Sequence, residues 1–545
     1  MRQHGTPTLP VLPVLARILG ALLLVLTGGA ASTATAARPL PAVPSAAVAA
    51  APVPLGRTVP VPAEVTPGGG PYTLTGATVI RVDGGSPGAR QVADRLAGLL
   101  RPSTGLALPV VAGAGTDGIQ LRLGAGDATL GTEGYRLTSG PGTVTITANH
   151  PAGLFHGVQT LRQQLPAAVE RRSLQPGPWQ VAGGAVRDFP RYPYRGAMLD
   201  VARHFFTVDQ VERYVDQLAL YKVNTLHLHL SDDQGWRIVV DSWPRLAAYG
   251  GSTQVGGGRG GYYTKADYRE IVAYAASRYM EVVPEIDTPG HTNAALASYA
   301  RLNCDGVARP RYTGTAVGFS SLCVPKAVTY SFLDDVLREL SALTPGRYLH
   351  IGGDEAQATT AADYAAFMAR AQPLVTRRGK TVMAWHQLTA AKPVRGAVAQ
   401  YWGPGGTEAQ LVAAAAAGTR VVMSPATHAY LDMKYTASTP VGTRWAGFVE
   451  VDRAYAWDPA TLVERMPARG VLGVEAPLWT ETVRTADALE YLAFPRLPGI
   501  AEIGWSPAAT HDWTAYRARL AAQGPRLTAL GVDYYRSPLV RWPAG

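Results

Sequence analysis

The sequence predicts an α/β protein in which a small α+β domain precedes a (β/α)8 TIM barrel. Eight short apolar runs follow Arg191, and segments with helical spacing separate most of them. This alternation is typical of parallel strands that are joined by helices. The Gly-rich stretches 250–251 and 256–261 do not join a strand directly to a helix, which disfavours the phosphate-binding turn of an open, doubly wound sheet. A closed barrel is therefore the predicted architecture.

Each of the eight apolar runs has the length of one barrel strand. The predicted strands are Gly196–Val201, Thr225–Leu230, Glu281–Ile286, Tyr348–Ile351, Val382–Trp385, Val398–Trp402, Val421–Met423 and Leu472–Ala476. After the first run, Thr207 and Gln210 have the spacing of a capping box and predict the start of a helix with an apolar face. A second helix is expected over residues 266–278.

A smaller domain is expected over residues 66–188, ahead of the barrel domain at 189–545. Its segments change between strand and helix periods without the regular alternation of the barrel. Strands are expected at 77–82, 118–123 and 143–148, and helices at 92–101 and 152–165. Since this region holds no cluster of catalytic residue types, we expect the chemistry to lie in the barrel.

The N-terminus has the parts of a secretory signal peptide. Arginine charges flank or precede the apolar run Ile18–Leu26, and small residues at 34–36 form a cleavage site. The run is shorter than the roughly 20 residues that a membrane span needs. We therefore expect a signal peptide at 1–36, a Pro- and Ala-rich linker at 37–65, and a secreted, extracellular mature protein that is free of the membrane.

The formal charge of +10 raises the question of a nucleic-acid partner. The basic residues are mostly single arginines, without the basic runs or interleaved aromatics that polyanion binding uses. We expect solvated surface charge and no nucleic-acid partner. A monomer is the favoured state.

The chain has 2 cysteines, Cys304 and Cys323. In an oxidising compartment they can close one loop, and the alternative is a pair of free buried thiols. Because export is expected, the disulfide is favoured. So few thiols disfavour a structural zinc site, and we expect neither a metal nor a cofactor.

Polar and aromatic side chains follow every predicted barrel strand. In strand order they are Asp200 and Arg203, Asp232 and Trp236, Asp287 and His291, Asp354 and Glu355, Trp385 and His386, Tyr401 and Trp402, Tyr430 and Asp432, and Trp479 and Glu481. The carboxyl ends of barrel strands meet at one rim, where active sites lie. Tryptophan faces suit the C–H faces of a sugar ring, and carboxylates with an arginine suit its hydroxyls. The rim therefore indicates a carbohydrate site.

Asp354 and Glu355 form the most specific feature of this rim. Glycosidases need a proton donor and a group that stabilises positive charge at the anomeric carbon. Neighbours on a regular strand point to opposite faces, so both can serve one site only where the backbone turns, and Gly352–Gly353 permits that turn. Adjacent residues are poorly placed on opposite sides of one bond. This favours a mechanism in which the substrate supplies the nucleophile.

Four segments resemble the signature of glycoside hydrolase family 20. They are RGAMLDVARHF at 195–205, HLHLSDDQGWR at 227–237, PEIDTPGH at 284–291 and HIGGDE at 350–355. The resemblance covers about residues 66–540 and is closest to bacterial, exo-acting members. It implies a β-N-acetylhexosaminidase that removes terminal, non-reducing N-acetylglucosamine or N-acetylgalactosamine with retention. The substrate's acetamido group assists through an oxazolinium-type intermediate.

The resemblance also implies a role for each site residue. Glu355 would be the general acid and base, Asp354 would hold the acetamido N–H, and Tyr430 would donate to the acetamido oxygen. The substrate-binding set would be Arg203, Asp232, His291, Trp385, Trp402, Asp432, Trp445, Trp479 and Glu481. Within it, Asp232 and His291 would form a relay beside Glu355. The partners would be oligosaccharides that contain N-acetylhexosamine, either chitooligosaccharides or glycans.

Two other functions are weighed against this one. A non-catalytic carbohydrate-binding barrel is the alternative, and the intact Asp354, Glu355 and Tyr430 set argues against it. A barrel metallohydrolase would use His227 and His229 as a metal pair, but the other strand ends lack matching ligands. Both histidines are expected to be hydrogen-bonded inside the barrel, and Trp236 and Trp505 to be packing residues. Asp233, Asp287 and His386 are left open between structural and functional roles.

Overall fold

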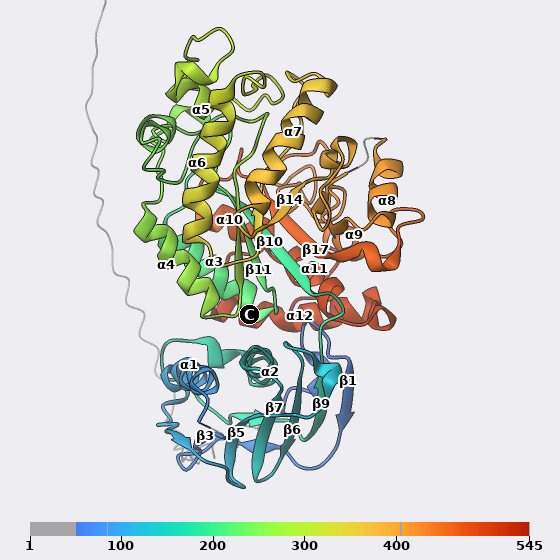
Figure 1. Ribbon diagram of the computed structural model, residues 1–545. Helices are drawn as coiled ribbons and strands as arrows, with labels where there is room; N and C mark the ends of the chain where they lie inside the picture. The colour runs from blue at the N-terminus through green and yellow to red at the C-terminus, as the bar shows by residue number, and fades with distance from the viewer. Residues whose placement is uncertain (1–50, 84, 404–405, 544–545) are drawn as a thin grey trace, which may run out of the picture. The chain divides into compact units, whose positions relative to one another are not determined.

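The computed structural model describes residues 51–83, 85–403 and 406–543 (Figure 1). The predicted signal peptide at 1–36 and the first part of the predicted linker lie outside these residues. The described residues belong to one compact unit. Within the described ranges, no helix has the length and apolar character to cross a bilayer.

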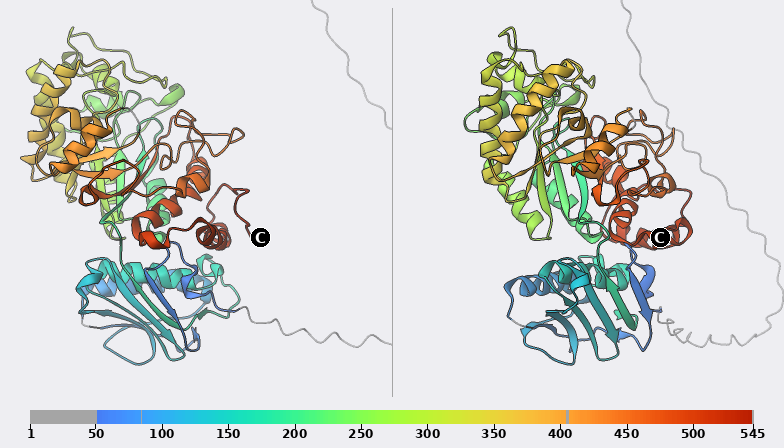
Figure 2. Two further views of the ribbon diagram at one scale, coloured as in Figure 1. Left: turned by 90° about the vertical axis from the view of Figure 1, so that its right-hand side faces the viewer. Right: turned by 45° about the vertical axis from the view of Figure 1, so that its right-hand side comes forward.

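The smaller domain is built on a sheet with the strand order β1-β9-β6-β7-β5-β3-β4. Its strands are β1 (Glu64–Pro67), β3 (Ile80–Val82), β4 (Val110–Ala112), β5 (Gly118–Leu123), β6 (Tyr135–Gly140), β7 (Thr143–Ala148) and β9 (Gly184–Asp188), and β2 (Tyr72–Thr73) pairs separately with β8 (Gln180–Val181). The helices α1 (Pro87–Thr104) and α2 (Pro151–Gln164) cover one face of the sheet (Figure 2). The predicted elements of this domain are therefore present, with the first strand shorter than expected.

The structure places the start of this domain earlier than residue 66. Leu55 and Val59 are buried in the core, and β1 already pairs with β9 at Glu64. The Val59 amide donates to Gln163 Oε1 at 2.9 Å, and Gln163 Nε2 donates back to the Val59 carbonyl at 2.7 Å. The described part of the expected linker is thus packed structure. Its Pro- and Ala-rich composition conceals this, because the few apolar residues that pack there have no repeating period.

The larger domain is a closed barrel of eight parallel strands in sequence order. They are β10 (Tyr194–Asp200), β11 (Thr225–His229), β12 (Glu281–Glu285), β13 (Tyr348–His350), β14 (Thr381–Trp385), β15 (Val398–Tyr401), β16 (Arg420–Met423) and β17 (Val471–Leu478). The barrel closes where β10 pairs with β17, from Tyr194 opposite Gly473 to Leu199 opposite Leu478. All eight predicted strands are confirmed, which confirms the TIM barrel.

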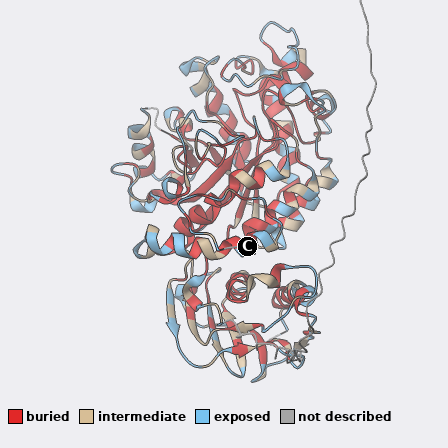
Figure 3. Cartoon of the chain, turned by 180° about the vertical axis from the view of Figure 1, so that it is seen from behind, coloured by how far each residue is buried: buried red, intermediate tan, exposed pale blue. Residues whose placement is uncertain are grey.

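Helices surround the barrel, as the alternating pattern predicts. They are α3 (Val208–Leu220), α4 (Lys265–Ala276), α5 (Asn293–Ser298), α6 (Ala327–Leu343), α7 (Ala361–Thr376), α8 (Glu408–Ala416), α9 (Val451–Tyr455), α10 (Ala486–Ala493), α11 (Arg496–Trp505) and α12 (Trp513–Ala529). The expected capping of α3 is present, since the Thr207 amide donates to Gln210 Oε1 at 2.8 Å. Buried residues fill the strands and the inward faces of the helices, and exposed residues gather on the outer faces (Figure 3).

The interior of the barrel has an apolar base and a polar upper part. The base is one cluster of buried side chains: Tyr194, Val283, Tyr348, Met383, Val398, Val422 and Leu472. Towards the carboxyl ends of the barrel strands, the buried side chains include His227, His229, Glu285, His350, Gln400 and Glu475. The polar end of the barrel is therefore the end at which the candidate site lies.

Buried ion pairs join the smaller domain to the barrel. Lys222, which follows α3, donates to Asp188 Oδ2 at 2.7 Å, and Trp505 Nε1 donates to Asp188 Oδ1 at 2.9 Å. Arg195 of β10 contacts Glu133 Oε1 at 2.6 Å. Removing one partner of such a pair leaves a buried charge without compensation, so these contacts tie the two domains together.

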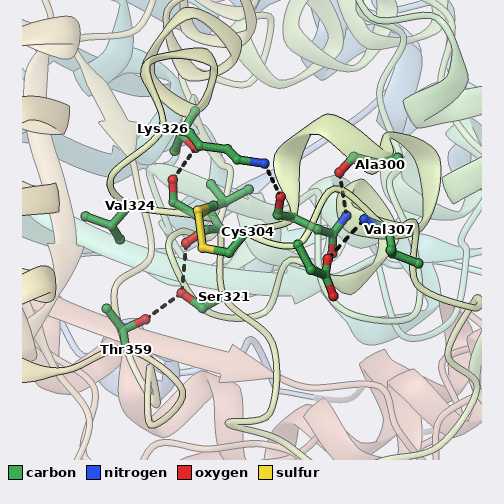
Figure 4. The surroundings of a disulfide bond; sticks show 12 residues. Ala300, Cys304, Val307, Ser321, Val324, Lys326 and Thr359 are labelled. Carbon is green, nitrogen blue, oxygen red and sulfur yellow. Dashed lines mark hydrogen bonds between the residues drawn. A yellow bond between two sulfur atoms is a disulfide. The ribbon is translucent and has the colours of Figure 1, made fainter.

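The expected disulfide between Cys304 and Cys323 is present (Figure 4). It closes a loop between α5 and α6, and Thr329 Oγ1 donates to the Cys323 carbonyl at 2.7 Å. The same loop meets the segment after β13, because the Ala358 amide donates to the Gly318 carbonyl at 3.0 Å and Ser321 Oγ lies 2.6 Å from Thr359 Oγ1. The disulfide thus supports the loop that carries Asp354 and Glu355.

Candidate active site

The backbone turns sharply between the end of β13 and the two adjacent acids. Gly352 has φ +68° and Gly353 has φ +101°, both in the left-handed region that glycine tolerates. A Cβ atom on Gly352 would lie 1.7 Å from Asp287 Oδ1, so no larger residue fits without a shift. Glu355 itself has φ +42°, an uncommon conformation for a residue with a side chain. The turn that the glycine pair predicts is therefore present.

Asp354 and Glu355 reach the same imidazole. His291 Nε2 lies 3.5 Å from Glu355 Oε2 and 3.8 Å from Asp354 Oδ2. Asp354 is buried, whereas the Glu355 side chain keeps 32% of its surface exposed. One acid is thus shielded from water and its neighbour opens to solvent, at a single site.

A third carboxyl joins this pair. Asp287 is buried, and its Oδ1 accepts from the Gly353 amide at 3.0 Å. Burial, followed by the nearby Asp354 charge, raises the pKa of Asp287 well above its ordinary value. Burial also raises the pKa of Asp354 to about 6, with Glu355 and Glu285 adding to the effect and His291 opposing it. A ligand that supplies a hydrogen-bond donor or a positive charge would therefore stabilise the ionised form of Asp354.

Three tryptophans and a tyrosine gather beside the acids. Trp385, Trp479 and Tyr430 belong to one buried cluster, and Trp402 packs against it. The ring centroids of Trp385 and Trp479 are 5.7 Å apart, and those of Tyr430 and Trp479 are 6.2 Å apart. Such rings supply flat apolar surface next to a site of buried charge.

Tyr430 and Trp445 mark the inner and outer parts of this aromatic group. Burial, with the nearby Asp354, raises the pKa of Tyr430 well above its ordinary value, so its hydroxyl stays protonated and can donate. Trp445 is 57% exposed, and its ring lies 5.9 Å from that of Tyr430 and 5.8 Å from that of Trp402. Trp445 therefore stands at the rim, where a longer ligand would leave the site.

Arg203 connects two groups of acids. Its Nη2 lies 2.8 Å from Asp232 Oδ2, its Nη1 lies 3.6 Å from Asp200 Oδ2, and its guanidinium lies over the Trp479 ring at 4.8 Å. Burial alone would lower the pKa of Arg203, but the charges of Asp232, Asp200 and Glu481 raise it. Arg203 is a fixed cation at this site.

Asp232 and His291 lie in contact, as the expected relay requires. His291 Nδ1 is 3.3 Å from Asp232 Oδ1. Burial would raise the pKa of Asp232, but Arg203 and His291 lower it far below its ordinary range. Burial would lower the pKa of His291, but Asp232, Asp287 and Asp354 raise it well above its ordinary value. The pair is therefore an ionised carboxylate against an imidazolium that faces Glu355.

Glu481 is a further acid near Arg203, and Asp432 lies near Glu481. Thr443 Oγ1 donates to Asp432 Oδ2 at 3.0 Å. Burial and then the Glu481 charge raise the pKa of Asp432 to about 8. Burial also raises the pKa of Glu481, although Arg203 opposes this. Both carboxyls gain from ligand groups that can donate hydrogen bonds to them.

Several buried polar atoms of these residues have no hydrogen-bond partner among the described residues. They are Arg203 Nε and Nη1, His291 Nε2, Asp354 Oδ1, Asp432 Oδ1, Trp479 Nε1 and Glu481 Oε2. Buried polar atoms are nearly always paired, so such a group needs an explanation. A ligand that carries several hydroxyls and an amide would satisfy donors and acceptors of both kinds. This is the chemistry of an N-acetylated sugar.

The sequence predicts no site role for Glu285 or His229, and it leaves the role of Asp287 open. Glu285 accepts from Trp385 Nε1 at 2.8 Å, and His229 Nε2 lies 2.8 Å from Asp232 Oδ2. Asp287 contacts the turn that carries Asp354 and Glu355. The only local signal for Glu285 and His229 is a polar residue inside an apolar strand run, which does not tell a site residue from a buried structural ion pair.

Buried histidines and acids also form groups that could hold a cation. Within the part of the chain that the structure describes, four overlapping triads have ligand atoms within 4.8 Å of one another: His227, Glu285 and His350; His229, Asp232 and Asp287; Asp232, Asp233 and His291; and Asp287, His291 and Asp354. Several of these side chains pair with one another, such as His227 with Glu285 at 3.1 Å and His229 with Asp232. As expected, both strand histidines lie inside the barrel in contact with acids.

Comparisons with known proteins agree with this geometry. The protein-family model described as "Glycosyl hydrolase family 20, catalytic domain" matches residues 192–365 and 357–508. The family model for domain 2 of the same family matches residues 56–189. A β-N-acetylhexosaminidase from Cellulomonas fimi is 42% identical over 486 residues, which cover 89% of this chain and 96% of that protein.

Solved structures of the same family are similar over nearly all of their length. The β-N-acetylhexosaminidase of Streptomyces coelicolor A3(2) has a TM-score of 0.89 and 65% identity, covering 91% of this chain and 100% of that one. The Streptomyces plicatus N-acetyl-β-hexosaminidase in complex with thio-NAglucal has the same TM-score and identity, covering 90% and 99%. The chain therefore belongs to glycosyl hydrolase family 20, with the catalytic barrel and the preceding domain 2 of that family.

Proposed function

We propose that this chain is an exo-acting β-N-acetylhexosaminidase that uses the acetamido group of its substrate as the nucleophile. The observation that carries the proposal is the contact of both Asp354 and Glu355 with His291, beside the cluster of Trp385, Trp479 and Tyr430. The buried Asp354 and the partly exposed Glu355 lie on one turn, so one can orient the acetamido group while the other transfers the proton. The family membership and the named relatives support the same activity.

In the first step, the acetamido carbonyl oxygen attacks the anomeric carbon. The bond from that carbon to the leaving oxygen breaks, and Glu355 gives its proton to that oxygen. Asp354 accepts a hydrogen bond from the acetamido N–H and balances the positive charge of the cyclic intermediate. The Tyr430 hydroxyl donates a hydrogen bond to the attacking oxygen. Because the attack is intramolecular, it can lower the barrier by roughly 7–11 kcal/mol at best.

In the second step, water opens the cyclic intermediate. Glu355, now a carboxylate, takes a proton from the water, whose oxygen bonds to the anomeric carbon as the acetamido oxygen leaves. Two displacements at one carbon give net retention. His291 lies beside Glu355 in both steps, and the Asp232 carboxylate holds the positive charge of that imidazole in place.

The remaining site residues bind the terminal sugar. Arg203, Asp432 and Glu481 offer unpaired buried donors and acceptors for ring hydroxyls. Trp385, Trp402 and Trp479 offer faces for the acetamido methyl and the ring, and the exposed Trp445 offers one for the next sugar. The substrates we propose are chitooligosaccharides or glycans with a terminal N-acetylhexosamine. A structure of the S. plicatus relative in complex with its product, GlcNAc, supports this class.

We also propose that the protein is secreted as a monomer after removal of residues 1–36. The support is the composition of the N-terminus and the presence of a disulfide, which persists in oxidising compartments.

The mechanism is tested by leaving-group dependence. Glu355→Gln should abolish turnover of N,N′-diacetylchitobiose, whereas an aryl N-acetylglucosaminide with an acidic phenol should retain far more, because that phenol leaves without a proton. Asp354→Asn should impair both substrates, since both need the acetamide. Equal losses on both substrates in Glu355→Gln would refute the acid role. Binding without any turnover by the unmodified protein would favour a carbohydrate-binding protein instead.

A further inference from the structure

The carboxylate of Glu285 is surrounded by four nitrogen atoms from three neighbouring strands. Its Oε1 lies 2.8 Å from Trp385 Nε1 and 2.9 Å from His350 Nδ1, and its Oε2 lies 2.5 Å from His229 Nδ1 and 3.1 Å from His227 Nε2. Glu285 is fully buried at the carboxyl end of β12. The hydrogen bonds from Trp385 and His229, with the two other histidines in close contact, make this carboxylate a single anchor for the side chains around it.

The charges in this part of the barrel are complementary. Burial alone would raise the pKa of Glu285, but His350 and His229 lower it well below its ordinary value. Burial would lower the pKa of His229, but Glu285 and Asp232 raise it well above its ordinary value. His229 is thus an imidazolium between two carboxylates, and its positive charge depends on Glu285.

Two chains of contacts lead from Glu285 to the reacting groups. One is direct, through the indole N–H of Trp385, whose ring lies in the aromatic cluster. The other runs through His229 Nε2 to Asp232 Oδ2 at 2.8 Å, and then from Asp232 Oδ1 to His291, which faces Glu355. A displaced Glu285 would therefore disturb both the acetamide site and the relay beside the acid.

We propose that Glu285 is a positioning residue for the hydrolysis: it fixes the Trp385 indole and, through His229, keeps Asp232 and His291 aligned on Glu355. Glu285 does not act on the substrate itself. This inference rests on the proposed roles of Trp385 and Glu355.

The test compares Glu285→Gln with Glu475→Gln. Both acids are fully buried in the same barrel and both contact His227, in the case of Glu475 at 2.9 Å. Glu475 also accepts from Gln400 Nε2 at 2.6 Å and from Tyr194. It therefore matches Glu285 in burial, charge and shape. It shares His227 with Glu285, but none of its hydrogen bonds or ion pairs among the described residues is made with Trp385 or His229.

The glutamine amide can accept at one end only, so Glu285→Gln leaves either Trp385 or His229 facing a donor. We expect kcat/KM on an aryl N-acetylglucosaminide to fall by about 100-fold, the cost of a misplacement of roughly 1 Å. A thiazoline analogue of the cyclic intermediate should bind at least about 10-fold more weakly, because the indole is no longer fixed. Glu475→Gln should stay within a few-fold of the unmodified enzyme in both measurements.

The pH profile separates positioning from a loss of packing. Without the Glu285 charge, the pKa of His229 should fall, so the alkaline limb of kcat moves to lower pH in Glu285→Gln and not in Glu475→Gln. The ionisable groups that face Glu285 and His229 from the neighbouring strands and loops are His227, Asp232, Asp287, His350, Asp354 and Glu475. All of them are the same in both variants except the residue replaced.

The outcomes are distinguishable. If Glu355→Gln keeps full activity on N,N′-diacetylchitobiose, the proposed function fails. If Glu355→Gln is inactive but Glu285→Gln behaves as Glu475→Gln does, only the positioning role fails. Should Glu285→Gln not fold, Trp385→Phe and His229→Asn each interrupt one chain of contacts. The first should raise KM and the second should lower kcat and shift its pH profile, and unchanged parameters in both would overturn the inference.

Discussion

Replacing Gly352 by alanine should disable the site with only a moderate loss of stability. Gly352 lies between β13 and the acids, with φ +68°, and an added Cβ would fall 1.7 Å from Asp287 Oδ1. Asp287 cannot retreat freely, since its amide donates to Ser231 Oγ at 3.2 Å and its Oδ1 accepts from the Gly353 amide at 3.0 Å. The turn that carries Asp354 must therefore move.

The size of the effect follows from two contributions. A left-handed conformation costs an L-residue about 1–2 kcal/mol. The overlap adds about 1–3 kcal/mol, as overpacking in a well-packed interior does, because the separation must double to reach the 3.4 Å at which ordinary contact begins. The free energy of unfolding should thus fall by about 2–5 kcal/mol. A shift of the acids by about 1 Å should reduce kcat/KM by about 100-fold.

Gly379→Ala is the matched control. Gly379 has φ +72°, and an added Cβ would meet nothing within 4 Å. This variant should lose only the backbone contribution and keep its activity. Urea denaturation and kcat/KM on a chromogenic N-acetylglucosaminide measure both quantities. If Gly352→Ala and Gly379→Ala lose the same stability and neither loses activity, the close contact with Asp287 has no role in shaping the site.

Three further outcomes are expected. Activity should decline as the pH falls through about 6, because the pKa of Asp354 is raised to about 6 and the ionised form that balances the charge of the intermediate prevails only above that pH. If Asp354→Asn shows the same decline at acidic pH, the decline belongs to another group. The double variant Cys304→Ser/Cys323→Ser, which opens a loop with a sequence separation of 19, should lose about 3 kcal/mol of stability in urea denaturation, and an unchanged midpoint would contradict this. Trp445→Ala should leave stability within about 0.5 kcal/mol, since the side chain is 57% exposed. It should raise KM for N,N′-diacetylchitobiose more than for an aryl N-acetylglucosaminide, and equal KM changes would argue against a contact with the second sugar.

The sequence by itself determined the barrel and the two adjacent acids. Parallel barrel strands are covered on both faces, so each appears as a short apolar run whose length and spacing are visible without a structure. Asp354 and Glu355 could be predicted as site residues because the glycine pair before them indicates a turn at the end of a strand. The prediction of a linker is wrong for residues 51–65, because this segment packs through contacts with α2 that leave no periodic pattern in the sequence.

Only the tertiary structure decided how these groups act together. Glu285 and Trp385 are 100 residues apart in the chain, yet they share a hydrogen bond across the barrel interior. The charge states of Asp287 and His229 are likewise set by side chains that reach them from other strands and loops. Charge and pKa depend on distance in space and on burial, and closure of the barrel creates both; a linear pattern records which side chains are available but not which of them meet.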